Sequence, residues 1–191
     1  MSSSASEVAV EIRDMIAVVR LMRPAKRNAL SDALMAEIDA AFAALPKSVG
    51  CAVLAGSGDH FSAGLDLSEI RERDAVEGLH HSRSWHRILG NLEFGRIPIV
   101  AALHGAVVGG GLELASSCHI RVADDTAFFA LPEGSRGIFV GGGGSVRIPK
   151  LIGAHRMLDM MLTGRVYKAA EAVPLGFAQY HVAAGLALEK A

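Results

Sequence analysis

Two glycine-rich segments, each followed by an acidic residue, constrain this sequence more than any other feature. The first is Phe61–Leu67 (FSAGLDL) and the second is His104–Ala115 (HGAVVGGGLELA). Glycine lets the backbone approach a ligand closely and leaves N–H groups free to point at it. Two such turns, if brought together, form a two-donor hole for a developing oxyanion. A carboxylate beside that hole can move protons, so the pattern favours chemistry at a carbonyl that becomes an enolate.

Composition narrows the classes of protein that this chain can belong to. The 191 residues are 51% apolar, carry a formal net charge of −1 and include two cysteines, and the mean hydropathy is +0.33. We therefore expect one domain, residues 1–191, with a sizeable core. The charge offers no basic surface, so no nucleic-acid partner is expected. Cys51 and Cys118 lie in apolar surroundings and are interpreted as core thiols of a cytoplasmic protein.

We expect neither a membrane span nor a secretion signal. The longest apolar run, Ile97–Leu112, contains His104 and four glycines. It is shorter than the roughly 20 residues that a spanning helix needs, so no membrane partner is expected. The segment Met1–Val10 is rich in serine and alanine and has no basic start, which is unlike a signal peptide.

The order of apolar patterns predicts strand–strand–helix units joined by short crossovers, which is an α/β arrangement. The β-branched runs Val8–Ile12 and Ile16–Leu21 predict an N-terminal hairpin. Ser31 is placed to cap a helix whose apolar residues recur at helical spacing. Further strands are predicted at Cys51–Leu54, Ile97–Leu103, Ile120–Ala123 and Ala127–Ala130. Helices are predicted at Leu67–Arg73, Ala75–Leu92, Gly109–Ser117, Met157–Leu162 and Ala169–Val173. Gly141–Gly144 opens another predicted helix, and Tyr180–Ala191 is predicted to be the start of a last one.

Two glutamates are the candidate groups for proton transfer. Glu113 lies one turn into the helix that the glycine triplet opens and has apolar neighbours. Burial there would raise the pKa of the carboxyl group toward a working range, whereas a solvated helix residue is the alternative. Glu133 follows a proline and precedes a glycine-rich segment, and an ordinary loop glutamate is the alternative.

Other candidate binding residues are supported less strongly by residue type and spacing. The triplet Gly109–Gly111 opens a predicted helix whose unpaired N–H groups could hold an anionic oxygen, with a tightly packed turn as the alternative. Lys26 and Arg27 could meet phosphate groups, although an exposed basic pair is more often plain surface. His80 and His81 are expected on the surface, and no ligands at metal-binding spacing accompany them, so no metal site is expected.

These residues together resemble the crotonase family, the enoyl-CoA hydratase/isomerase superfamily. Phe61–Leu67 and His104–Ala115, in this order and spacing, carry the likeness. It continues through RPAKRNAL (23–30), LPE (131–133), GIFVGGGG (137–144) and residues 147–153, so it covers nearly the whole chain. The resemblance implies a spiral of strand–strand–helix repeats assembled as a homotrimer or homohexamer.

The resemblance also implies a substrate and a site. The substrate would be an acyl-CoA thioester whose carbonyl accepts hydrogen bonds from the N–H groups of Leu65 and Gly110. Glu113 and Glu133 match the catalytic glutamates of the hydratases. Glu113 would activate water for attack on the β-carbon, and Glu133 would share that water and give a proton to the α-carbon. The residues that would contact the CoA ester are Lys26, Ala63, Gly64, Asp66 and Gly109. No separate cofactor is implied, because CoA arrives with the substrate.

Some features depart from the family pattern. The chain stops at Ala191, where family members usually continue, so we expect a truncated C-terminal helical region. The segment Gly134-Ser135-Arg136 and the four-glycine run also differ from the usual sequence of the hydratases. The preference for the acyl group of the substrate is therefore left open. A double-bond isomerase, which needs only one proton shuttle, and a non-catalytic CoA-ester-binding protein remain as alternatives.

Overall fold

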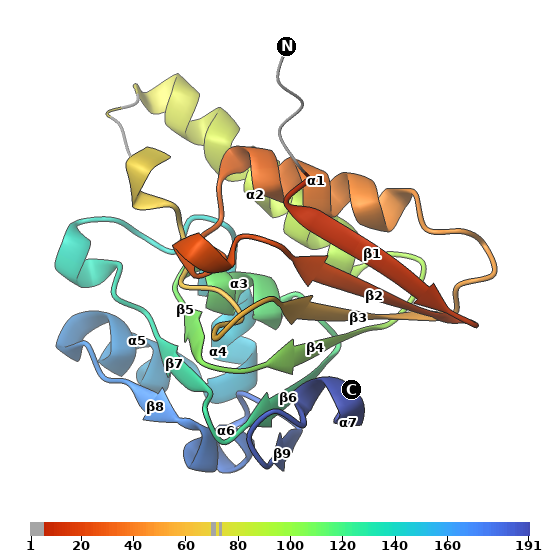
Figure 1. Cartoon of the computed structure of the whole chain (residues 1–191). Coiled ribbons are helices and arrows are strands. Elements are labelled where there is room, and N and C mark those ends of the chain that lie inside the picture. The colour runs from red at the N-terminus through yellow and green to blue at the C-terminus, as the bar shows by residue number, and fades with distance from the viewer. Residues whose placement is uncertain (1–5, 70–71, 73) are drawn as a thin grey trace.

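The larger sheet has six strands in the order β1–β2–β3–β4–β6–β9. The computed structural model describes residues 6–69, 72 and 74–191. β1 pairs antiparallel with β2, and each later neighbour pairs in parallel. Figure 1 shows the strands descending from β1 at the upper right to β9 at the bottom. The strands are β1 (Val8–Arg13), β2 (Ile16–Leu21), β3 (Cys51–Gly56), β4 (Ile99–Leu103), β6 (Ile120–Asp124) and β9 (Tyr180–Val182).

The central strands are apolar on both faces, which is typical of a parallel sheet covered on both sides. Five of the six residues of β3 are buried, as are four of the five residues of β4. The predicted N-terminal hairpin is confirmed, with Val8 opposite Leu21 and Arg13 opposite Ile16.

A smaller sheet lies beside the larger one (Figure 1). It has the order β5 (Ala106–Val108), β7 (Phe128–Ala130) and β8 (Tyr167–Lys168). β5 pairs in parallel with β7, and Ser62 forms an isolated parallel bridge to Val107. The apolar run that predicted one strand and a helix therefore contains two strands, because the turn at Gly105 separates β4 from β5.

Helices follow the strands as the sequence pattern predicts. The Ser31 hydroxyl accepts a hydrogen bond from the N–H of Leu34, which confirms the predicted cap. The helices are α1 (Asp32–Ala43), α2 (Ala75–Glu93), α3 (Gly110–Ser116), α4 (Gly144–Ile152), α5 (Ala154–Thr163), α6 (Ala169–Leu175) and α7 (Ala187–Lys190), with 3₁₀ turns at Pro24–Lys26, Leu67–Glu69 and Gly134–Arg136. Within the described ranges, no helix has the length and apolar character needed to cross a membrane.

Two predicted helices differ from the structure. The helix predicted to start in Tyr180–Ala191 is wrong for its first residues, because Tyr180–Val182 adds to the edge of the larger sheet beside β6. Only Ala187–Lys190 is helical there. The helix predicted at Leu67–Arg73 begins as one 3₁₀ turn, and residues 70, 71 and 73 of that prediction lie outside the described residues.

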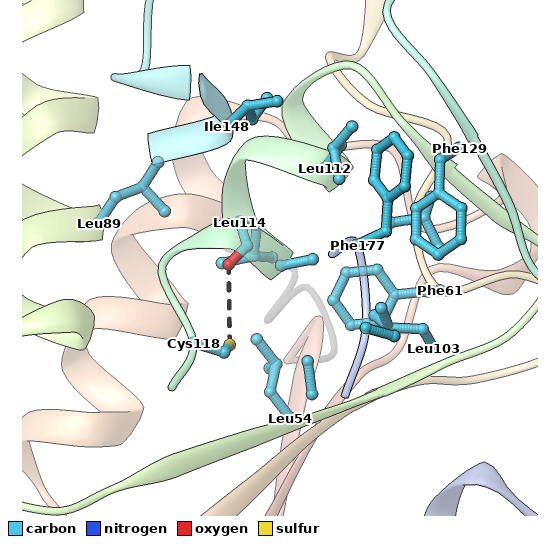
Figure 2. Packing of buried hydrophobic residues seen from close by; sticks show 14 of the residues in the cluster. Leu54, Phe61, Leu89, Leu103, Leu112, Leu114, Cys118, Phe129, Ile148 and Phe177 are labelled. Atoms are coloured by element: carbon cyan, nitrogen blue, oxygen red, sulfur yellow. Dashed lines mark hydrogen bonds between the residues drawn. The ribbon is translucent and has the colours of Figure 1, made fainter. Parts of the chain in front are cut away.

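The main core surrounds α3, as Figure 2 shows for Leu112, Leu114 and their neighbours. Phe129 and Phe177 stack there with ring centroids 4.7 Å apart. The thiol of Cys118 is buried, and burial raises its pKa to about 12, as a core thiol requires. Cys51 is only partly buried. Since α3 is buried on all sides, any polar group on it must be paired or functional.

Candidate active site

The two glycine turns lie against each other. The N–H of Ser62 donates to the carbonyl of Ala106 at 2.9 Å, and the Ser62 carbonyl accepts from the N–H of Val108 at 3.1 Å. Gly64 has a φ of +92°, and a methyl group there would lie 2.7 Å from the Val108 carbonyl oxygen and 3.3 Å from the Gly110 nitrogen. Only glycine adopts this conformation and fits this close approach, which fixes the first turn against the second.

Leu65 and Gly110 hold two N–H groups that the fold does not use. Within the described part of the chain, neither N–H has a hydrogen-bond acceptor. A methyl group on Gly110 would lie 3.5 Å from the Leu65 nitrogen, so the two turns bring these N–H groups to the same place. Both residues border one cavity. Such a pair of fixed donors can stabilise an oxyanion.

Asn28, which the sequence analysis did not single out, organises the first turn. Its side chain is fully buried, and its amide donates to the carbonyls of Ser57 and His60 at 2.9 and 2.7 Å. The Asn28 backbone carbonyl accepts from the Ser62 hydroxyl at 2.8 Å. Its φ of 52° is a left-handed conformation that asparagine tolerates better than most residues. This tolerance is the feature of the sequence from which a special backbone position at Asn28 could have been predicted.

Asp66 belongs to a charge cluster rather than to the cavity. Its Oδ2 accepts from Lys26 Nζ and from Arg23 Nη2, each at 2.9 Å, and its Oδ1 accepts from the Ser68 hydroxyl at 2.6 Å. The hydrogen bonds from Ser68 and Lys26 hold the pKa of Asp66 well below its usual range. Asp66 therefore fixes the position of Lys26 beside the first turn.

Glu113 is the charged residue of the otherwise apolar helix α3, and it is only 4% exposed. Its Oε1 accepts from the N–H groups of Gly142 and Gly144 at 2.9 and 2.8 Å. Its pKa is raised to about 7, chiefly by burial and also by the charge of Glu133, while the two N–H groups and Arg147 oppose the shift. The alternative of a solvated helix residue is therefore wrong.

Glu133 is also buried, at 6% exposure. Within the described ranges, its Oε2 has no hydrogen-bond partner. A methyl group on Gly109 would lie 2.7 Å from its Oε1, so the carboxyl group lies directly against the second turn. Burial raises its pKa, while its own N–H and Arg136 oppose the shift. Its burial differs from the exposure of an ordinary loop glutamate, and burying a carboxyl group in this way is costly.

One cavity of about 230 Å³ brings Leu65, Gly110, Glu113 and Glu133 together. Its apolar walls come from Trp85, Ile138 and Phe139. A smaller hollow of about 50 Å³ shares Leu65 and Glu133 with it and is also bordered by Ala63, Gly64 and Gly109. The predicted site residues thus converge, except for Lys26 and Asp66, which form the neighbouring ion pair.

Helix α2 supplies cavity residues that the sequence analysis missed or placed elsewhere. His81 borders the cavity and its side chain is 25% exposed, so its predicted surface position holds only in part, whereas His80 is exposed as predicted. The Oδ1 of Asp32 accepts from Trp85 Nε1 at 2.8 Å and lies 2.9 Å from His81 Nε2. The spacing of four residues between His81 and Trp85, which puts both on one helix face, was the signal available.

The arrangement can stabilise a developing oxyanion and move protons beside it. No group of three or more His, Cys, Asp or Glu side chains that could hold a metal ion occurs among residues 6–69, 72 and 74–191. The fold and the cavity thus define an α/β protein with a two-donor hole and a pair of buried carboxylates.

Comparison with known proteins identifies the family. The sequence model of a protein family described as "Enoyl-CoA hydratase/isomerase" matches residues 11–190. A "probable enoyl-CoA hydratase" from Rhizobium meliloti (strain 1021) is 38% identical over 186 residues, which are 95% of this chain and 71% of that protein. The chain therefore belongs to the enoyl-CoA hydratase/isomerase family, the crotonase family, as the sequence motifs predicted.

Solved structures agree with this assignment. A "putative enoyl-CoA hydratase" from Rhodopseudomonas palustris CGA009 is 58% identical, with a TM-score of 0.95 over 97% of this chain and 72% of that one. A protein of the same description from Thermobifida fusca YX, solved in complex with CoA, is 29% identical, with a TM-score of 0.88 over 96% and 75% of the two chains. The crotonase fold predicted for this chain is confirmed.

Proposed function

We propose that this chain adds water across the double bond of a 2-enoyl-CoA thioester. One observation carries the proposal: the buried carboxylates of Glu113 and Glu133 border the same cavity as the unpaired N–H groups of Leu65 and Gly110. The family of the chain and the names of its relatives support the same activity.

The two N–H groups would act on the thioester oxygen. As water adds to the β-carbon, negative charge develops on that oxygen and the thioester becomes an enolate. Leu65 and Gly110 are held in place by the contact between the two turns before any substrate arrives. Donors fixed in this way stabilise the transition state selectively, and one such donor contributes about 10²–10³-fold in rate.

Glu113 and Glu133 would divide the proton transfers. Two neighbouring carboxylates in a poorly solvated site favour sharing one proton. Glu113 is the ionised partner in our proposal, because two N–H groups hold its Oε1. It takes a proton from water as the C–O bond forms. Among the described residues, none donates to Oε2 of Glu133, so Glu133 is the protonated partner in our proposal. It shares the water and gives its proton to the α-carbon. Exchange with solvent then restores the starting state.

The CoA ester would lie along the first turn. Ala63, Gly64 and Gly109 border the small hollow next to the two donors. The side chain of Lys26 is 53% exposed and its charge is held in place by Asp66, so it can meet a phosphate group of CoA. The Thermobifida fusca relative, which was solved with CoA, supports this ligand class. We propose no separate cofactor, since CoA enters with the substrate.

We further propose that the chain acts as one crotonase-like domain in a cytoplasmic homotrimer or homohexamer, with neither nucleic-acid nor membrane partners. The support is the family resemblance. Analytical ultracentrifugation would test the assembly, and a monomer at micromolar concentration would contradict it.

Proton NMR of crotonyl-CoA in heavy water tests the activity, beside a β,γ-enoyl-CoA sample. We expect a 3-hydroxyacyl product that carries deuterium on the α-carbon. A double-bond shift without hydration would instead favour an isomerase, for which the unpaired oxygen of Glu133 would suffice as a single proton shuttle. Binding of both esters without conversion would favour a non-catalytic CoA-ester-binding protein.

A further inference from the structure

The glycine loop 141–144 is held from several directions at once. The hydroxyl of Ser82 on α2 donates to the carbonyl of Gly141 at 2.8 Å. Arg147 Nη1 on α4 donates to the carbonyl of Gly142 at 3.3 Å. The loop in turn presents the N–H groups of Gly142 and Gly144 to Glu113. The position of those two donors therefore depends on groups outside the loop.

Arg147 also forms an ion pair with helix α2. Its side chain is 9% exposed, and its Nε lies 2.6 Å from Oε2 of Glu93, a residue in the last turn of α2. One guanidinium group thus ties α2 to α4 and holds the loop between them. A methyl group on Gly143 would contact Arg147 Nη1 and lie 3.1 Å from the ring of His86, so the loop fits closely between these side chains.

We infer that Arg147 and Glu93 form a positioning pair that keeps the loop N–H groups on Oε1 of Glu113 and leaves its second oxygen for proton transfer. The inference deepens the proposed function, because it concerns the same carboxylate. Arg147 is a positioning residue, since it contacts Glu93 and the loop carbonyl and acts on the reacting atoms through them.

Charge acts in the same direction as geometry. The positive charge of Arg147 favours the ionised form of Glu113 and lowers its pKa, whereas Glu133 raises it. The ionisable groups near Glu113 and its loop are Arg147 on α4, Glu133 before the 3₁₀ turn, and His81, His86 and Glu93 on α2. Loss of Arg147 should therefore raise the pKa of Glu113 and move the acidic limb of the activity profile to higher pH.

The test compares kcat, KM and the pH profile of crotonyl-CoA hydration in four variants. Arg147→Met removes the charge and the hydrogen bonds, whereas Arg147→Lys keeps the charge and loses the planar fork. Glu93→Gln removes the charge of the partner and keeps its size. Arg87→Met is the matched control, because it breaks a 2.7 Å ion pair between α2 and Asp39 of α1.

We expect Arg147→Met to lower kcat by about 10²-fold with little change in KM, because small displacements of catalytic groups have effects of this size. The acidic limb of the pH profile of Arg147→Met should shift to higher pH. Arg147→Lys should have this limb at the wild-type position but should recover only part of the wild-type kcat. Glu93→Gln should lower kcat less, and Arg87→Met should match the wild type. If Arg147→Met does not fold, kcat of Arg147→Lys and Glu93→Gln is compared with kcat of the wild type and of Arg87→Met.

An unchanged pH profile in folded Arg147→Met, wild-type kcat in both Arg147→Lys and Glu93→Gln, or an effect confined to KM would overturn the inference. Failure of the proposed function is distinguishable, since the wild type would then not hydrate crotonyl-CoA at all. In that case, carbon NMR titration of Glu113, assigned with Glu113→Gln, still tests the pair. We expect a higher pKa of Glu113 in Arg147→Met than in the wild type, and an equal value would contradict the inference.

Discussion

Asp66 and Glu113 are both buried carboxylates that closely follow a glycine turn, but their partners differ. Asp66 accepts from Lys26 and Arg23, each at 2.9 Å, and its pKa lies well below the usual range chiefly because Ser68 donates to it. Within the described ranges, the hydrogen bonds to the Glu113 side chain come only from backbone N–H groups, and burial raises its pKa to about 7.

The difference separates a carboxylate that holds its neighbours in place from one that can exchange a proton. A carboxylate that is paired with cations keeps its charge throughout the physiological range and fixes its neighbours. A buried carboxyl group whose pKa lies near neutrality can lose and regain a proton during turnover. In the mechanism that we propose, the two turns therefore have separate tasks: the first fixes Lys26 and supplies one N–H donor, and the second supplies the other donor and the proton-transfer group.

The largest expected effect is on turnover by the glutamate variants. Glu113→Gln and Glu133→Gln should each lower kcat of hydration by about 10²–10⁴-fold, because each removes a general acid or base. Binding of a saturated acyl-CoA should be nearly unchanged. Asp66→Asn is the contrasting variant, and its kcat should stay within a few-fold of wild type. Unchanged turnover in Glu133→Gln would remove the role assigned to it, and tolerance of Glu113→Gln alone would favour the isomerase.

Gly110→Ala should lower kcat/KM by about 10²-fold, because the added methyl group lies 3.5 Å from the Leu65 nitrogen and obstructs the space between the donors. Its other contacts, at 3.4 and 3.6 Å, are tolerable, so we expect a folded protein. The matched control is Gly90→Ala in α2, where a methyl group meets nothing within 4 Å. Equal activity of both alanine variants would argue against the two-donor hole.

The pH dependence of unfolding should distinguish the two carboxylates by sign. The pKa of Glu113 is raised from 4.5 to about 7 in the fold, so its stabilising contribution is complete below about pH 4.5 and is lost as pH rises through about 7. Glu113→Gln, which stays neutral, should therefore exceed the wild type in free energy of unfolding at pH 8 by about 3 kcal/mol. Denaturant titrations at pH 5 and pH 8 measure this, and a gap that does not widen with pH would contradict it.

Asp66→Asn should show the opposite dependence. Its lowered pKa means that its contribution is present above its ordinary pKa of 3.8 and is lost as pH falls toward its value in the fold. The variant should be less stable than wild type at pH 7 by about 2–3 kcal/mol, since it removes a hydrogen-bonded charge. The same titrations extended to pH 3 should show this deficit shrinking, and a constant deficit would mean that its charge is not the cause.

The smallest effect is expected for Lys26→Met. Lys26 is half-exposed, and partly exposed ion pairs contribute about 0–1 kcal/mol. The Kd for a CoA ester should rise by about fivefold with kcat unchanged. Lys150→Met on the exposed side of α4 is the control. An equal loss of affinity in this variant would mean that CoA is attracted by positive surface charge in general and not by Lys26 itself.

The sequence by itself determined many of the helices and strands and the residues that are candidates for the chemistry. Ser31, the β-branched runs and the glycine triplet act locally, through capping, strand preference and backbone freedom, so they could be interpreted without tertiary contacts. The pair of glutamates could be named for the same reason, from glycine turns and apolar neighbours. The C-terminal strand Tyr180–Val182 could not, because its pairing partner β6 lies far away in the sequence.

Only the tertiary structure decided which acid is paired with cations and which is buried against backbone N–H groups. The loop donors that hold Glu113 lie 29 and 31 residues further along the chain, and the partners of Asp66 precede it by 43 and 40 residues. Desolvation and hydrogen bonding set a carboxyl pKa, and both depend on which distant groups the fold brings within about 3 Å. Folding therefore assigns different roles to two acids that look alike in the sequence.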